Sequence, residues 1–240
     1  MPLPKINTPT YELVLPSSGK KIKYRPFLVK EEKILIMALE SEDSKQITNA
    51  IKDVLTDCIL SRGIKIEKLA TFDIEYLFLN VRAKSVGETV EVNITCPDDN
   101  ETQVQVEIDI DSIKVQKSDT HSDIIQLDND LSLQMNYPSL NQFIETNFEV
   151  GGEKSEVEQS LNVIMSCIKQ VYSSEEAWDA SDCSKKELKD FVEQMNSKQF
   201  KQVEDFFNTM PKLSHTLKVT NPNTKVKSDV TIEGLASFFS

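Results

Sequence analysis

Two short stretches of this 240-residue chain contain part of a known binding motif. Cys96-Pro97-Asp98-Asp99 resembles half of a zinc knuckle, in which a second cysteine three positions later would also bind the metal, but no such cysteine follows. Ser18-Gly19-Lys20-Lys21 matches the end of a phosphate-binding loop, but the glycine required five residues before the Gly-Lys pair is Val14. We therefore expect neither zinc nor a nucleotide at these positions.

The other candidate motifs are also incomplete. Ser17 and Lys20 have the spacing of an acyl-enzyme fragment whose partner motifs are absent, and Asp128-Asn129-Asp130 begins like a calcium loop without its turn glycine. The two histidines, His121 and His215, have no cysteine, histidine or carboxylate at metal-ligand spacing. The sequence thus predicts no catalytic residues, no metal and no cofactor, and a protein that is not an enzyme.

Composition predicts a globular protein of the cytoplasm. Apolar residues make up 39% of the chain and charged residues 28%, and the length suffices for one large domain or two small ones. The longest apolar run, residues 34–39, is too short to span a membrane, and the N-terminus lacks the pattern of a signal peptide. The four cysteines are widely spaced, and Cys58 and Cys167 fall on apolar helix stripes, so we expect buried thiols and no disulfide framework.

The negative charge of the chain is concentrated in one segment. Residues 97–160 contain 15 acidic and 3 basic residues, a balance equal to the net charge of −12 of the whole chain. Such a segment repels phosphate, so we expect no binding of nucleic acid through it. It could attract a basic protein partner, or it could be a solvated face that keeps the protein soluble, and the sequence leaves both alternatives open.

Periodicity predicts an α+β fold with a helical core and separate antiparallel β-hairpins near the N-terminus, in the middle and at the C-terminus. The helix over 72–88 is apolar nearly all round, which indicates a central, buried position. Asp43 or Ser44 can cap the helix over 44–63, and Ser155 with Glu158 and Ser184 with Glu187 form capping boxes. The expected elements are hairpins over 11–24, 89–110 and 215–239, weak strands over 124–127 and 131–135, and helices over 28–43, 44–63, 72–88, 138–148, 155–168, 184–195 and 197–210.

The middle and C-terminal hairpins share a short sequence pattern. Ile94-Thr95-Cys96-Pro97 aligns with Val219-Thr220-Asn221-Pro222, and Asp98 aligns with Asn223. A common turn chemistry, with proline and Asn or Asp setting a tight reversal, explains the match, and duplication of a hairpin explains it equally well. With Gly151-Gly152 as linker, the sequence predicts regions 1–115, 116–152 and 153–240, or alternatively one compact domain.

Three longer runs carry a resemblance to a known family. They are LPSSGKKIKYRPFLVKEEKILIMALESED, FDIEYLFLNVRAKSVGE and TMPKLSHTLKVTNPNTKVKSDVTIEGLASFF. Together they resemble the baseplate hub subunit and hub assembly protein family of T-even-type, contractile-tailed bacteriophages, over nearly the whole chain. The resemblance implies a non-enzymatic late protein that binds other hub or tape-measure proteins during hub and tail assembly, as an assembly factor or chaperone, or alternatively as a permanent structural subunit. It also implies the host cytoplasm, and alternatively the virion baseplate, as location, and it supplies no catalytic residues.

Two groups of residues are candidates for partner binding. The terminal stretch places apolar anchors at helical spacing on one face, although core packing is an alternative role for them. Acidic residues of the turns within 98–130 are the second group. The predicted partner-binding residues are Leu235, Phe238, Phe239, Asp98, Asp99, Asp128 and Asp130.

Overall fold

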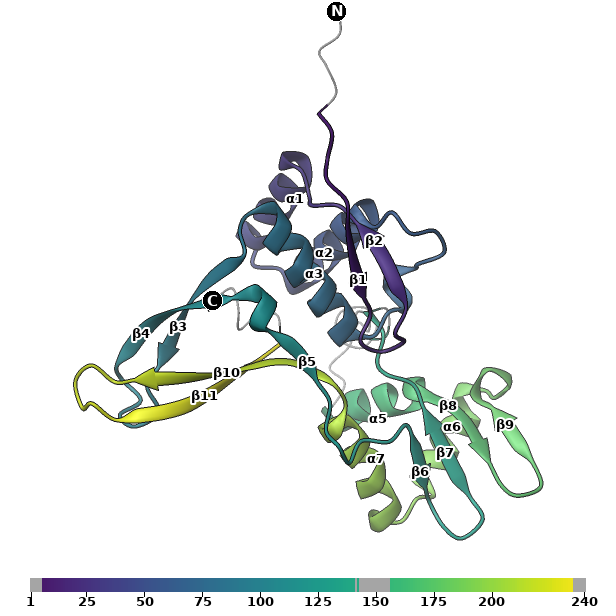
Figure 1. Cartoon of the computed structure of the whole chain (residues 1–240). Coiled ribbons are helices and arrows are strands. Elements are labelled where there is room, and N and C mark those ends of the chain that lie inside the picture. Colours follow the sequence, from purple (N-terminus) through teal and green to yellow (C-terminus); the bar gives the residue numbers. More distant parts are fainter. Residues whose placement is uncertain (1–5, 141, 143–155, 235–240) are drawn as a thin grey trace, which may run out of the picture. The chain divides into compact units, whose positions relative to one another are not determined.

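The computed structural model describes residues 6–140, 142 and 156–234, and it confirms an α+β fold of helices and small antiparallel sheets (Figure 1). The chain divides into two compact units. Unit 1 comprises residues 1–66, 72–116 and 212–240, and unit 2 comprises residues 67–71 and 117–211. The sequence analysis placed region boundaries after residues 115 and 152. The structure divides the chain differently, because the C-terminal hairpin belongs to the same unit as the N-terminal elements.

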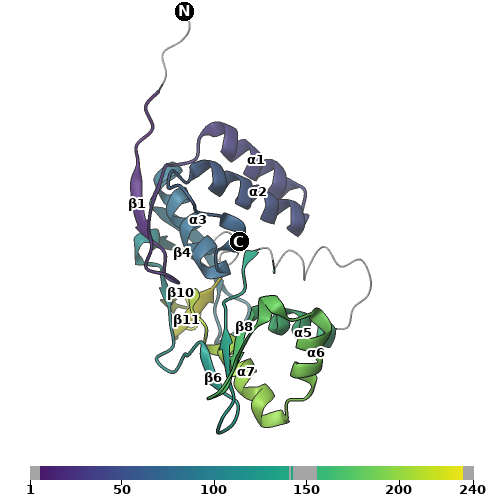
Figure 2. The ribbon, with the colours of Figure 1, turned by 90° about the vertical axis from the view of Figure 1, so that its right-hand side faces the viewer.

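Unit 1 begins with a hairpin and continues with helices. Strands β1 (Tyr11–Val14) and β2 (Lys21–Tyr24) pair as expected, and they are followed by α1 (Val29–Glu40), α2 (Ser44–Cys58) and α3 (Thr71–Ser85). Helix α1 packs against α2, and Figure 2 shows the helices of this unit from the side. Asp43 caps α2, because its Oδ1 accepts hydrogen bonds from the N–H groups of Lys45 (2.8 Å) and Gln46 (3.2 Å).

Helix α3 is central to unit 1, as its apolar sequence predicts. Its buried residues are Phe72, Asp73, Ile74, Leu77, Phe78, Leu79, Val81 and Ala83. The carboxylate of Asp73 accepts hydrogen bonds from the backbone N–H (3.0 Å) and the hydroxyl of Ser17, which fastens the β1–β2 turn to the helix. Burial raises the pKa of Asp73, since a charged carboxylate is poorly solvated there.

Two further hairpins complete unit 1. Strands β3 (Thr89–Thr95) and β4 (Gln103–Asp109) pair antiparallel, and so do β10 (Lys212–Thr220) and β11 (Lys227–Glu233). Strand β5 (Lys114–Gln116) pairs with the start of β10, which joins two segments nearly a hundred residues apart. The middle and C-terminal hairpins are therefore confirmed, whereas β5 was not predicted.

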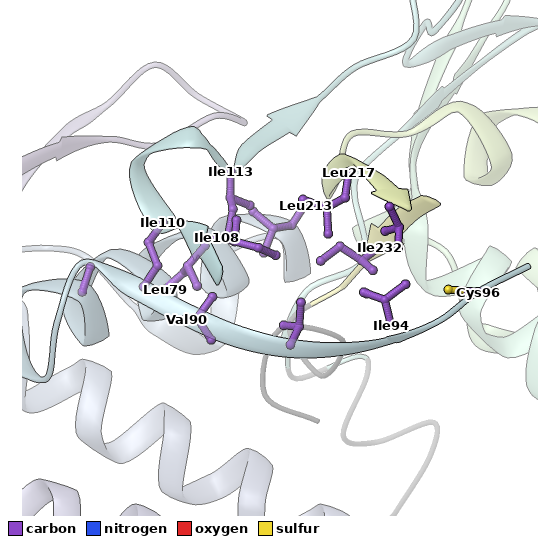
Figure 3. Close-up of a cluster of buried hydrophobic side chains, with 13 residues drawn as sticks. Leu79, Val90, Ile94, Cys96, Ile108, Ile110, Ile113, Leu213, Leu217 and Ile232 are labelled. Atoms are coloured by element: carbon purple, nitrogen blue, oxygen red, sulfur yellow. The ribbon is translucent and has the colours of Figure 1, made fainter. Parts of the chain in front are cut away.

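The two hairpins share one apolar core with α3 (Figure 3). Alternate residues of β3 are buried, as the period of two in its sequence predicts. The buried members of this core are Leu79, Ala83, Val90, Val92, Ile94, Cys96, Ile108, Ile110, Ile113, Leu213, Leu217, Val219 and Ile232. Figure 3 shows Cys96 at one end of the core, beyond Ile94.

In its described residues, unit 2 combines a four-stranded antiparallel sheet with three helices. The strand order is β6 (Ile124–Gln126), β7 (Ser132–Met135), β8 (Ile168–Tyr172) and β9 (Ala177–Asp179). The helices are α5 (Glu156–Cys167), α6 (Lys185–Glu193) and α7 (Ser197–Thr209), and a short 3-10 helix lies at Ala180–Asp182. Two further 3-10 helices lie at Ile110–Ser112 in unit 1 and at Ile66–Lys68, where the chain passes from unit 1 to unit 2. The capping box of Ser184 and Glu187 is confirmed, whereas Ser155 and most of the expected helix over 138–148 lie outside the described residues.

His121 connects two segments of unit 2. Its Nδ1 lies 3.0 Å from the hydroxyl of Thr209, and its Nε2 lies 3.1 Å from the hydroxyl of Tyr137. The imidazole also stacks on the ring of Tyr137 and lies against the ring of Phe206, at centroid distances of 5.6 and 5.1 Å. This histidine therefore has a packing role in the core of the unit.

Candidate partner-binding surfaces

Helix α1 exposes apolar side chains to solvent. Val29 is 79% exposed, Met37 61% and Leu39 60%, although large apolar side chains are usually buried. Leu28, Ile34 and Ile36 are also exposed. We name these six residues, Leu28, Val29, Ile34, Ile36, Met37 and Leu39, the α1 face.

A buried ion pair determines which side of α1 is exposed. Glu31 in the first turn is only 1% exposed, and its carboxylate binds the guanidinium of Arg25, with Nη2 at 3.0 Å and Nη1 at 3.3 Å. The N–H of Leu28 also donates to Glu31 (2.6 Å), and the ammonium of Lys30 lies 2.9 Å away. Because the charged residue turns inward, together with Ala38, the apolar residues at other positions of the helix turn outward.

The start of α1 is also fixed to the end of α3. The N–H of Phe27 donates a hydrogen bond to the hydroxyl of Ser85 (2.9 Å). Ser85 is followed by Val86, which is 58% exposed. Leu28 and Val86, both exposed apolar residues, thus each directly follow a residue of this contact.

Asp98 and Asp99, two of the predicted binding residues, lie in the turn between β3 and β4. Asp99 accepts hydrogen bonds from Asn221 (2.8 Å) and from the backbone and side chain of Thr102. Asp98 accepts from Asn221 (3.1 Å) and from the hydroxyl of Thr224 (2.5 Å). Hydrogen bonds from Thr102 lower the pKa of Asp99, and those from Thr224 and Asn221 lower the pKa of Asp98. Both carboxylates thus join two hairpins of unit 1.

Asp128 and Asp130 lie in unit 2, between β6 and β7. Asp128 accepts hydrogen bonds from the N–H groups of Asp130 and Leu131, both at 2.9 Å. Asp130 accepts from the N–H (3.2 Å) and the hydroxyl (2.6 Å) of Ser174, which lowers its pKa. Leu235, Phe238 and Phe239 lie outside the described residues. The four acidic residues therefore belong to turns of two different units, and each has a local structural role.

The buried thiols are poor candidates for chemistry. Burial raises the pKa of Cys58 to about 11 and that of Cys167 to about 12. A thiol must lose its proton to act as a nucleophile or metal ligand, so these residues behave as small apolar side chains, as predicted. Among the residues that the structure describes, no three His, Cys, Asp or Glu side chains gather in a way that could hold a metal ion. In the same part of the chain no helix has the length and apolar character needed to cross a membrane.

Sequence reasoning did not identify the α1 face. The signal was the apolar run of residues 34–39, which we interpreted only as too short for a membrane span. Six consecutive apolar residues in a helix point in all directions, so some must face away from the core unless the helix is enclosed. A helix at the surface of its unit, paired with α2, therefore leaves part of the run exposed.

The fold and these surfaces define a two-unit α+β protein with an exposed apolar helix. A family model of T4 bacteriophage base plate proteins matches residues 8–240, so the chain belongs to this family and is a phage baseplate protein. No curated protein and no solved structure matches it significantly. The resemblance drawn from the sequence is thereby confirmed at the level of the baseplate.

Proposed function

We propose that this chain is a non-enzymatic hub protein of the baseplate, which promotes hub or tail assembly by binding other tail proteins through the α1 face. The observation that carries the proposal is the exposure of six large apolar side chains on and beside a single short helix. The partners we propose are hub or tape-measure proteins. The protein acts in the host cytoplasm during assembly.

Physical chemistry supports the α1 face as a binding surface. Burial of apolar area stabilises a complex by roughly 25 cal/mol per Å² before the costs of association. Contiguous apolar patches with a polar rim mark interaction sites on soluble proteins. Here Lys30, Lys33 and Glu40 are exposed on the same helix, and the turn of 100° per residue places them among the exposed apolar side chains. Apolar anchors among charged residues favour a partner with an apolar groove rather than a small polar ligand.

The experiment compares two triple variants of equal size. Val29→Ser with Ile36→Ser and Met37→Ser removes the centre of the α1 face, and we expect the yield of complexes with other tail proteins from infected cells to fall at least tenfold. Val14→Ser with Leu60→Ser and Ile124→Ser is the control, because these residues are about half exposed but lie outside the α1 face. Thermal unfolding verifies that both variants fold. Undiminished complex formation by a folded first variant would refute the proposal.

The alternative function is that of a permanent structural subunit of the virion hub. Both functions require the same contacts, so they differ in whether the contacts persist. Mass spectrometry of purified particles distinguishes them. A chaperone is found in complexes from infected cells and is absent from mature particles, whereas a structural subunit is present in both.

A further inference from the structure

The turn between β3 and β4 and the turn between β10 and β11 have the same backbone structure. In the first, the N–H of Cys96 donates to the carbonyl of Thr102 (2.8 Å), and the N–H of Asn100 donates to the carbonyl of Cys96 (2.9 Å). In the second, the N–H of Asn221 donates to the carbonyl of Val226 (2.9 Å), and the N–H of Lys225 donates to that of Asn221 (2.9 Å). The first turn is longer by one residue. This extra residue comes after Asn100, so the first five positions of the two turns correspond.

The fifth residue of each turn has a left-handed backbone. Asn100 has a φ of 55° and Lys225 a φ of 64°, values that residues other than glycine seldom adopt. Prolines occupy the second position of both turns, Pro97 and Pro222. The two turns therefore share their backbone hydrogen bonds and a left-handed fifth residue as well as their residue types. Two turns that had only a few residue types in common would not need to agree in all of these.

The two turns bind each other through side chains. The amide nitrogen of Asn221 donates to Asp99 (2.8 Å) and to both oxygens of Asp98 (3.1 Å each), and the hydroxyl of Thr224 donates to Asp98 (2.5 Å). The amide of Asn223 donates to the hydroxyl of Thr102 (3.0 Å). Asn221 is only 1% exposed, so the centre of this network is shielded from water. We name the network the hairpin clasp.

Paired turns of this kind are the geometry of a zinc ribbon. In such a site each turn supplies its first and fourth residues as ligands, in the pattern C-x-x-C twice. The corresponding positions here are Cys96 and Asp99 in one turn and Asn221 and Thr224 in the other. The residues do not fit a cation, because only one is a thiol and the amide of Asn221 directs its N–H groups at the two carboxylates.

We propose that the paired turns form a metal-free zinc ribbon, in which the hairpin clasp joins the two hairpins in place of a zinc ion. The second turn lies more than a hundred residues after the first, because unit 2 is inserted between them. The sequence showed only half of a knuckle because Cys96 is the one cysteine among these four positions.

The backbone around Asn221 is already arranged for a metal ligand. The N–H groups of Asn223 (2.8 Å) and Thr224 (3.3 Å) both donate to its side-chain oxygen. The same groups would donate to a thiolate at position 221, and hydrogen bonds to the charged form lower the pKa of a thiol. The buried Cys96 needs no substitution.

The test restores the missing ligands in the full chain. The variant Asp99→Cys with Asn221→Cys and Thr224→Cys should bind one zinc ion with a dissociation constant below about 1 μM. Cobalt(II) should give the intense visible absorption of a tetrahedral thiolate site. The matched control, with serine at the same three positions, should bind neither ion, and neither should the natural protein. A folded cysteine variant that binds no metal would overturn the proposal, and so would stoichiometric zinc binding by the natural protein.

A second measurement does not depend on folding of the triple variant. Asn221→Ala removes the centre of the hairpin clasp, whereas Asn223→Ala removes only the contact to Thr102. We expect the amide hydrogens of Cys96 and Lys225 to exchange at least tenfold faster in Asn221→Ala than in Asn223→Ala, with α3 unaffected in both. Equal exchange rates in the two variants would show that the clasp does not join the turns.

Discussion

The guanidinium of Arg25 encloses the carboxylate of Glu31 with two hydrogen bonds, of 3.0 and 3.3 Å, at a position only 1% exposed to solvent. The pair connects the end of the first hairpin to the first turn of α1. It turns a charged side chain inward on a helix whose apolar side chains face outward. The orientation of the α1 face therefore depends on one ion pair, and the proposed binding surface can be tested through it.

Loss of the arginine should destabilise unit 1. In Arg25→Met the carboxylate of Glu31 keeps only the N–H of Leu28 and the exposed Lys30, and a buried charge without its partner costs about 3 kcal/mol. Urea denaturation measures the free energy of unfolding. The double variant Arg25→Met with Glu31→Met should recover most of the loss, because an apolar pair leaves no charge unpaired. A loss below about 1 kcal/mol in the single variant would contradict this view.

Acid should weaken the same contact. Burial alone would raise the pKa of Glu31, but hydrogen bonds from Arg25, the N–H of Leu28 and Lys30 outweigh it and lower the pKa from 4.5 to about 2. Because the pKa is lower in the folded state, the stabilisation is complete above pH 4.5 and is lost as the pH falls from there to about 2. The stability difference between the natural protein and Glu31→Gln should therefore narrow over this interval. A difference that stays constant in urea titrations would show that Glu31 is not the titrating group.

His121 should make unit 2 sensitive to mild acid. Burial, and then the charge of Lys117, lower the pKa of His121 from 6.5, and Asp123 opposes this only in part. The neutral imidazole is favoured in the folded state, so its contribution is complete above pH 6.5 and is lost as the pH falls from 6.5 to the lowered pKa. Thermal unfolding followed over this range should show a smaller pH dependence in His121→Gln. Identical profiles would refute the assignment.

Thiol labelling should separate one cysteine from the other three. Cys58, Cys96 and Cys167 are at most 1% exposed, whereas Cys183 is only partly buried. A disulfide reagent should therefore modify one thiol quickly in the folded protein and all four in urea, because burial limits access and raises the pKa of the three buried thiols. Cys183→Ser should lack the fast phase. Rapid labelling of a second thiol in the folded protein would contradict the described core.

Local patterns in the sequence predicted much of the fold. The apolar helix over 72–88 is α3, the alternation around Pro97 is the hairpin of β3 and β4, and Asp43 does cap α2. Each of these depends on neighbours within a few residues, where propensity and periodicity operate. The helix expected over 155–168 is α5, which ends at Cys167. The strand β8 that follows it directly was not predicted, because it depends on pairing with β7 and β9.

What the sequence did not reveal depends on contacts between distant residues. The pairing of β5 with β10 and the bond between Asn221 and Asp99 each join segments about a hundred residues apart. The exposure of Met37 depends on the inward turn of Glu31, which the sequence alone does not show. The acidic turns were interpreted as one binding segment, whereas the structure places them in two units. Partner binding by either candidate group, the acidic residues of these turns or Leu235, Phe238 and Phe239, remains a prediction.

The division of the chain also has a consequence for its synthesis. Nearly all of unit 2 is one continuous stretch, residues 117–211, which is synthesised in full before the C-terminal hairpin of unit 1. The apolar side chains of Val90 and Ile94 are buried only after Leu217 and Ile232 have been synthesised and pack in the same core. Nascent chains therefore carry an uncovered hairpin until translation is almost complete, and premature termination before β10 would leave a product prone to aggregation.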